Sequence, residues 1–436
     1  MKLRCKVRSV ISIHKGTVKM DHLLLLSALT LGIVVLIGFI NEKFFHLNYE
    51  ISLLLFSVLI GICLTVSVSL IRKESVKDFL QGIQIFDLEA FLMKGVLCFM
   101  LFAGSCHLKL SQFREFARPI GVLAIVCTLL GAVIYGLLFF AVASVFRLPF
   151  TLPVCLMFGS IIAPTDPIAA TSILKKFGLP RQTGFLMEGE SLLNDGVGVA
   201  LFAVFTGIVT AQKSGGFFVI MFREIVGAVL VGSAVTWLSF LLFKSTSDKS
   251  RRIMITLFAV SAAFTLCEIL DCSGAIACVV CGVLFSTLRE KEEQKGRNWE
   301  LEELDTFWET LDVLLNSALY VILGLSFVRV LQMPHVLGLA LAAILCNLAA
   351  RSGSLWAGSW LLGPIPDGYG RGGFIALFTW GGLRGGLSLA LAASTASIIP
   401  EETYVIILGC SYAIVFFTTV VQGLTMKRVF QRISKK

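Results

Sequence analysis

The residues best suited to chemistry lie in the stretch 188–196, which reads EGESLLNDG and is followed at once by an apolar run. It offers carboxylates, a hydroxyl and an amide within nine residues. In a helix, Ser191 and Asp195 are four residues apart. The same holds for Glu190 and Asn194, so all four side chains lie on one side of that helix. A helix this apolar lies in a membrane, where ionisable side chains are costly and functional. The stretch therefore predicts a polar site inside the bilayer.

The composition supports a membrane location. Of 436 residues, 56% are hydrophobic and 15% are charged, whereas a soluble domain averages roughly 25% charged residues. The net charge of +9 fits the concentration of Lys and Arg in cytoplasmic loops and tails, so we expect a lipid bilayer as partner and no nucleic acid. Most of the twelve cysteines lie in apolar segments and are expected to behave as small apolar residues.

The apolar segments predict an all-α, polytopic membrane protein. With about 20 residues per crossing, we count about 13 transmembrane helices. Their expected ranges are 22–41, 50–71, 88–107, 119–145, 149–171, 183–210, 217–243, 252–270, 272–288, 307–330, 335–360, 371–398 and 402–424. The charged stretch 289–305 reads as a solvated connector.

The distribution of basic residues predicts orientation. Most predicted loops alternate between basic and nearly uncharged, which places the short tail 426–436 in the cytoplasm. The protein is then a multi-pass protein of the plasma membrane, the inner membrane in a bacterium. The basic loop residues 72–77 and the basic segment 1–21 disagree with this alternation. Translation starting at Met20 would remove most of that N-terminal segment from the mature chain.

The fifth predicted helix is interrupted by Pro164-Thr165-Asp166-Pro167. Each proline removes a backbone donor and clashes with the preceding turn, so two prolines three residues apart predict two half-helices. Asp166 then occupies an N-cap position, with Pro167 as the first helical residue. Broken backbone at membrane depth is tolerated only beside protein or a watered cavity. A simple proline kink is the alternative, and the intramembrane aspartate favours the break.

The twelfth predicted helix carries a matching defect at 380–386, which reads WGGLRGG. Glycines weaken a helix and allow close backbone approach, and Arg384 suits the negative C-terminal end of a half-helix. Interrupted helices at corresponding places in two halves indicate a secondary transporter with inverted repeats. The repeats would cover about 22–210 and 252–424, with helix 217–243 as the linker.

The eleventh predicted helix adds a buried cation, Arg351. A buried arginine needs an anionic partner, because an unpaired buried charge costs several kcal/mol. The spacing leaves four partners open: Glu188, Glu190, Asp166 and Asp195.

These motifs together resemble one known family. Thr165-Asp166-Pro167, then 190–195 (ESLLND), then Arg351, then 381–385 (GGLRG) closely resemble monovalent cation:proton antiporters of NhaP type, which are related to the animal sodium/proton exchangers. The resemblance covers roughly residues 22–425. It implies a homodimer of thirteen-helix protomers with two crossing broken helices and an elevator-like movement. It also implies electroneutral exchange, because the Asn-Asp pair marks the branch without a second transport aspartate.

The resemblance also implies a binding site for the transported ions. Asp195 would bind either Na⁺ or a proton, with Thr165 and Ser191 as further oxygen ligands. Many relatives have an acidic residue near the positions occupied here by 102–105 (FAGS). Its absence leaves open the ligand number, and with it Na⁺, Li⁺ or K⁺ as the cation.

Supporting roles follow from the same resemblance. Glu190 would pair with Arg351, Asn194 would support the crossing, and Asp166 and Arg384 would neutralise half-helix ends. For Glu188, which lies nearer the helix start, we expect an interfacial or capping role.

The expected function is exchange of a monovalent cation for H⁺ by competition at Asp195 and alternating access, serving intracellular pH and sodium homeostasis. Exchange of K⁺ rather than Na⁺ is the alternative. No cofactor and no enzymatic activity are expected. An intramembrane aspartyl protease using Asp166 and Asp195 would need a Gly-x-Gly-Asp signature, which the chain lacks. A passive cation channel would carry current, whereas an antiporter would dissipate a pH gradient.

Overall fold

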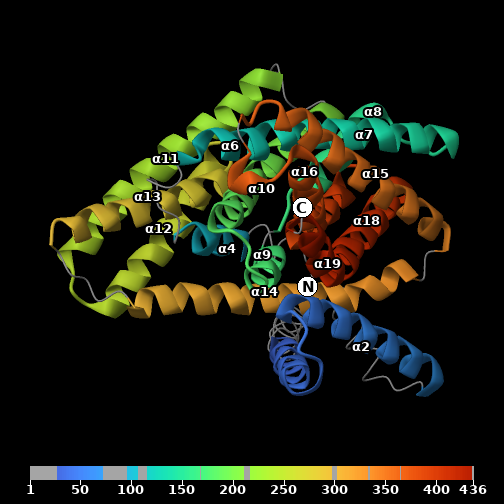
Figure 1. The fold of residues 1–436 in the computed structure, drawn as a ribbon, viewed down its shortest axis with the longest axis horizontal. Coiled ribbons are helices and arrows are strands. Elements are labelled where there is room, and N and C mark those ends of the chain that lie inside the picture. Colours follow the sequence, from blue (N-terminus) through green and yellow to red (C-terminus); the bar gives the residue numbers. More distant parts are fainter. Residues whose placement is uncertain are drawn as a thin grey trace, which may run out of the picture. The chain divides into compact units, whose positions relative to one another are not determined.

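The computed structural model describes residues 27–71, 96–106, 115–166, 168–210, 217–296, 302–331, 334–363 and 365–434 (Figure 1). Within these ranges the ordered elements are all helices, so the predicted all-α class is confirmed. The N-terminal segment 1–21, the basic loop residues 72–77 and the first half of the predicted helix 88–107 lie outside them.

The chain divides into two units. The smaller one contains the helix Ser27–Phe45, α2 (Tyr49–Ile71) and the end of α14 (Glu302–Leu331). The turn before α2 is held by Asn41, whose side chain accepts from the Leu47 N–H and donates to the Leu47 carbonyl, both at 3.0 Å. Close packing of α14 on α2 requires glycine at position 324, because a Cβ there would lie 2.5 Å from Ser57 Cβ.

The larger unit holds the remaining helices. In chain order they are α4 (Leu97–Ser105), α6 (Ala117–Gly121), the π-helix η3 (Val122–Cys127), α7 (Thr128–Val145), α8 (Leu152–Ile162), α9 (Ile168–Lys175), α10 (Arg181–Val209), α11 (Phe217–Ser245), α12 (Lys249–Ile269), α13 (Gly274–Gln294), the first part of α14, α15 (Pro334–Ser359), the 3₁₀ turn η4 (Pro366–Gly368), α16 (Arg371–Gly381), α17 (Gly386–Ser394), the 3₁₀ turn η5 (Thr395–Ser397), α18 (Glu401–Phe416), the π-helix η6 (Phe417–Gln422) and α19 (Gly423–Ser434).

Eight helices of the described residues are long and apolar enough to cross a membrane, and a bent pair makes a ninth candidate. The bent pair is α16 with α17–η5, which meet at 61°. This is the second predicted break. The first is also present, because α8 ends at Ile162 and α9 begins at Ile168. The chain is therefore a multi-pass membrane protein with two interrupted helices, and the number thirteen stays a prediction.

Helix α10 lies between two groups of helices in the larger unit (Figure 1). On one side, Leu201 and Phe205 join an apolar core built with α7, α8, α15 and α18. On another side, Leu192 joins a core built with α4, α11, α12, α13 and α14. Because apolar packing covers α10 on both sides, its polar residues are left facing the first break.

The expected connector 289–305 is shorter than predicted, because α13 continues to Gln294 and α14 begins at Glu302. Ion pairing explains the extension: Arg289 donates to Asp305 at 2.6 and 2.8 Å, which joins the two helix ends. Beside them, Glu292 pairs with Lys244 at 3.0 Å and Lys295 at 3.1 Å. Hydrogen bonds from Lys244 and then Lys295 lower the pKa of the Glu292 carboxyl.

Candidate functional site

The site is built on α10, whose polar residues meet the first break. Glu190, Ser191 and Asn194 are buried, and Asp195 is partly buried. Helical spacing places them on neighbouring turns. The residue at its N-cap, Pro180, provides no side-chain cap. The long stretch of small and apolar residues carries the helix through to Val209.

The N-terminal end of α10 is capped from a distant part of the chain. Asp367 in η4 accepts hydrogen bonds from the Thr183 N–H at 2.9 Å and the Thr183 hydroxyl at 2.6 Å. Thr183 is the third residue of the helix, so its amide is one of the four donors that lack an intrahelical partner. Glu188, for which we expected an interfacial or capping role, pairs with Lys175 at 2.8 Å.

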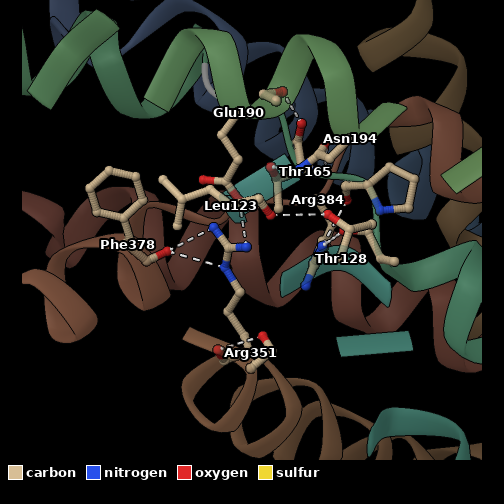
Figure 2. A network of polar contacts seen from close by, with 12 residues as sticks. Leu123, Thr128, Thr165, Glu190, Asn194, Arg351, Phe378 and Arg384 are labelled. Atoms are coloured by element: carbon tan, nitrogen blue, oxygen red, sulfur yellow. Dashed lines mark hydrogen bonds and ion pairs between the residues drawn. The ribbon is translucent and has the colours of Figure 1, made fainter. Parts of the chain in front are cut away.

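The first break is attached to α10 through Thr165. Asn194 Nδ2 donates to Thr165 Oγ1 at 2.7 Å, and the Thr165 N–H donates to Asn194 Oδ1 at 3.2 Å (Figure 2). The Ser191 hydroxyl donates to the Thr165 carbonyl. These bonds satisfy backbone groups that the prolines remove from the helical pattern. They also bring the hydroxyl oxygens of Thr165 and Ser191 to the same side of α10.

Asp195 differs from its neighbours on this helix. Within the described residues, no hydrogen bond or ion pair engages its carboxylate, while the charge of Asp166 acts on it electrostatically. Two carboxylates that act on each other electrostatically create a negative potential, which favours a cation. Such a group can also take up a proton instead of a cation.

Arg351 pairs with Glu190, one of the four partners that spacing left open. Arg351 Nη1 lies 2.6 Å from Glu190 Oε1, and both side chains are buried. The other guanidinium nitrogens, Nε and Nη2, each donate to the Phe378 carbonyl at 3.3 Å (Figure 2). That carbonyl belongs to the last turn of α16, where carbonyls lack intrahelical partners. Arg351 therefore joins α10 to the end of the second broken helix.

Arg384 belongs to the second break, but its side chain forms hydrogen bonds at the first break. Its Nη1 donates to the carbonyls of Ala163 and Pro164, the latter at 2.8 Å, at the C-terminal end of α8. Its Nη2 donates to Asn347 Oδ1 at 3.0 Å. We expected an arginine suited to the C-terminal end of a half-helix, and the end that it meets is that of the crossing partner.

Asp166 shows the reciprocal arrangement. Its N–H donates to the Leu383 carbonyl at 2.8 Å, which joins the two breaks directly. A Cβ on Gly385 would lie 2.9 Å from Asp166 Oδ2, so the carboxylate lies against the N-cap residue of α17. A carboxylate near a helix N-terminus is favourable. Each break thus places a charged side chain at the other helix.

Glycines make this crossing possible because a side chain would occupy the space of its partners. A Cβ on Gly382 would lie 2.9 Å from Arg351 Nε, and one on Gly198 of α10 would lie 2.4 Å from Pro164 Cγ. In α4 the described side chains of 102–105 carry no carboxylate, as in the sequence, and Gly104 faces Leu192 of α10.

Several residues of the crossing were missed by sequence reasoning. Thr418 Oγ1 accepts from the Arg384 N–H at 3.0 Å, and Thr419 Oγ1 donates to the Arg384 carbonyl at 3.3 Å. Both belong to the π-helix η6. They were missed because an apolar stretch of sequence gives no signal that distinguishes a π-helix from an α-helix. Asn347 could have been predicted from the sequence as a residue of the crossing, because it precedes Arg351 by one helical turn.

The comparisons with known proteins agree with this fold. The family model described as "Sodium/hydrogen exchanger, transmembrane" matches residues 25–432. The Na⁺/H⁺ antiporter NhaP of Pseudomonas aeruginosa is 29% identical over 427 residues, which cover 94% of this chain and 96% of that protein. The Na⁺/H⁺ antiporter NhaH of Halobacillus aidingensis is 30% identical over 340 residues, covering 76% of this chain and 80% of that protein.

A solved structure shares the fold. The sodium proton antiporter MjNhaP1 from Methanocaldococcus jannaschii at pH 8 matches with a TM-score of 0.73 and 20% identity, covering 96% of this chain and 99% of that chain. Because the named relatives are antiporters, the chain is a transporter rather than an enzyme. By the extent of the family match, the chain belongs to the transmembrane sodium/hydrogen exchanger family.

Proposed function

We propose that the protein exchanges Na⁺ for H⁺ by competition of the two ions for the carboxylate of Asp195. Family membership supports the class of transport, since relatives are named Na⁺/H⁺ antiporters. The observation that carries the site is the position of Asp195 on α10, one residue after Asn194 and one turn after Ser191, which both bond to Thr165 at the break. The exchange is one for one and electroneutral, and only loaded states cross the membrane.

The hydrogen bonds at the break favour cation binding. The Ser191 hydroxyl donates its hydrogen to the Thr165 carbonyl, so its lone pairs are free for a cation. The Thr165 hydroxyl accepts from Asn194 and retains a second lone pair. Hard monovalent cations prefer oxygen ligands of this kind. Asp195, Thr165 and Ser191 are therefore the proposed cation ligands, and Asp195 is also the proton acceptor.

The remaining charged groups would hold the geometry through the cycle. Glu190 and Arg351 form a buried pair at 2.6 Å, so neither is the exchanging group. Asn194 fixes Thr165. Arg384 and Asp166 each meet the other broken helix, so the two breaks would move as one body during alternating access.

Dequenching of a pH-sensitive dye in everted vesicles tests the proposal. Addition of Na⁺ should dissipate an imposed pH gradient in the wild type without carrying current, and Asp195→Asn should abolish the response. Glu309→Gln is the matched control, because it also removes a carboxylate but from an exposed position on α14. Exchange at wild-type rate by Asp195→Asn would refute the assignment, and a cation-driven current would support a channel instead.

The same assay with Na⁺, Li⁺ and K⁺ across a pH series would separate the proposed selectivity from K⁺/H⁺ exchange. We further propose a homodimer in the plasma membrane with a cytoplasmic C-terminus and a role in pH and sodium homeostasis. These proposals rest on the family and on the loop charges given above. Chemical cross-linking in membranes tests the dimer, and cysteine labelling of a Ser434→Cys variant from either side tests the orientation.

A further inference from the structure

A small polar cavity lies beside the crossing, between α7, α8 and α15. Its polar lining consists of Thr128, Tyr135, Asn347, Arg351, Ser354 and Arg384. The size of the cavity gives room for about one water molecule.

Two hydrogen-bonding atoms in this cavity are unpaired. Tyr135 is 2% exposed and Arg384 is 4% exposed. Among the described residues, neither the Tyr135 hydroxyl nor Arg384 Nε has a hydrogen-bond partner. Buried polar groups are rarely left in this state, and ordered water is the usual partner.

Other polar atoms of the lining already have hydrogen-bond partners. Asn347 Oδ1 accepts from Arg384 Nη2 at 3.0 Å. The Ser354 hydroxyl donates to the Arg351 carbonyl at 3.0 Å. A ligand that satisfies the two unpaired atoms must accept from Arg384 Nε and exchange a hydrogen bond with the Tyr135 hydroxyl. Water can do both.

The surrounding helices favour a specific site rather than a packing defect. The cavity is lined by Cys127, the last residue of the π-helix η3, and by Thr128, which follows it. The other π-helix, η6, supplies Thr418 and Thr419 to the backbone of Arg384. Short π-helical segments inside α-helices are frequent at functional sites.

We propose that this cavity binds one water molecule that bridges Tyr135 and Arg384, and that Tyr135 is thereby a positioning residue for transport. Arg384 Nη1 holds the carbonyls of Ala163 and Pro164, directly before Thr165. A guanidinium fixed at Nε keeps these carbonyls, and hence the proposed cation ligand Thr165, in place. This consequence for transport rests on the proposed function, whereas the water site itself does not.

A wild-type structure at a resolution that shows waters is the first test. We expect density for one water within hydrogen-bond distance of Tyr135 Oη and Arg384 Nε. A cavity without density would overturn the proposal, even if no variant could be purified. A halide in its place, seen as anomalous signal after exchange of chloride for bromide, would also overturn it.

Transport by Tyr135→Phe is the second test. Loss of the bridge should raise the apparent KM for Na⁺ by about 3- to 10-fold, the effect of one hydrogen bond, with kcat within about 2-fold. Tyr404→Phe is the matched control, because it removes a hydroxyl near the start of α18, and it should leave both constants unchanged. An unchanged KM in Tyr135→Phe would overturn the positioning role. Absence of exchange in the wild type would instead contradict the proposed function and leave the water density as a valid test.

Discussion

Removal of the Arg351 side chain should destabilise the protein far more than removal of an exposed lysine. In the Arg351→Ala variant, Glu190 keeps a buried carboxylate without its cation, and the Phe378 carbonyl loses two donors. The perturbation therefore acts on both α10 and the end of α16.

The magnitude follows from burial. The side chains of Arg351 and Glu190 are 6% and 3% exposed, whereas those of Lys175 and Glu188 are 63% and 33% exposed. Breaking a buried pair by removing one partner costs about 3–5 kcal/mol. Unit charges about 4 Å apart at an effective dielectric constant near 20 interact by a similar ~4 kcal/mol. An exposed pair contributes only about 0.2–1 kcal/mol.

The assay is chemical denaturation of the purified protein in mixed micelles, with folded yield measured by size-exclusion chromatography. Arg351→Ala should lower the free energy of unfolding by about 3–5 kcal/mol, and Lys175→Ala by about 1 kcal/mol or less. The charge swap Glu190→Arg with Arg351→Glu should recover part of the loss. Recovery stays partial because a carboxylate at position 351 cannot donate to the Phe378 carbonyl.

Equal destabilisation by Arg351→Ala and Lys175→Ala would refute this reasoning, since burial would then make no difference. A charge swap no better than Arg351→Ala would show that the pairing with Glu190 contributes nothing beyond the contact with Phe378.

Three further substitutions test other contacts. Asp367→Ala should cost about 1 kcal/mol in the same denaturation assay, because the first turn of α10 loses its cap, and Asp367→Asn should cost less. Gly198→Ala should slow exchange and lower the free energy of unfolding by about 1–3 kcal/mol, because the new Cβ would overlap the ring of Pro164. Gly121→Ala is the control and should be tolerated, because a Cβ at that position would have no neighbouring atom within 4 Å. The lowered pKa of Glu292 means that its ion pairs stabilise the fold above the unfolded-state pKa and are lost as the pH falls through the folded value. Glu292→Gln should therefore flatten the acid side of the stability curve, and an unchanged curve would contradict this.

Much of the architecture could be predicted because it depends on local properties. Apolar stretches of membrane-spanning length predict helices wherever they occur, and both breaks lie where Pro164-Thr165-Asp166 and the glycines around Arg384 predicted them. Helical spacing placed Glu190, Ser191 and Asn194 on neighbouring turns of one helix, as observed.

Other features could not be read from local patterns. The cap of α10 comes from Asp367, which is 184 residues from Thr183. The partner of Arg351 could not be chosen from four carboxylates by spacing. The extension of α13 and α14 into the expected connector depends on the ion pair between Arg289 and Asp305.

The sequence by itself determined that this chain has membrane helices, two of them broken, with a carboxylate-bearing helix between the motifs. Periodicity, proline and glycine act on the residues next to them, so these features need no knowledge of the fold. Only the tertiary structure decided which helix end each charge meets, with Arg384 at the end of α8, Arg351 at the end of α16 and Asp166 beside α17. The physical reason is that long side chains reach across a crossing, so their partners depend on how distant segments pack.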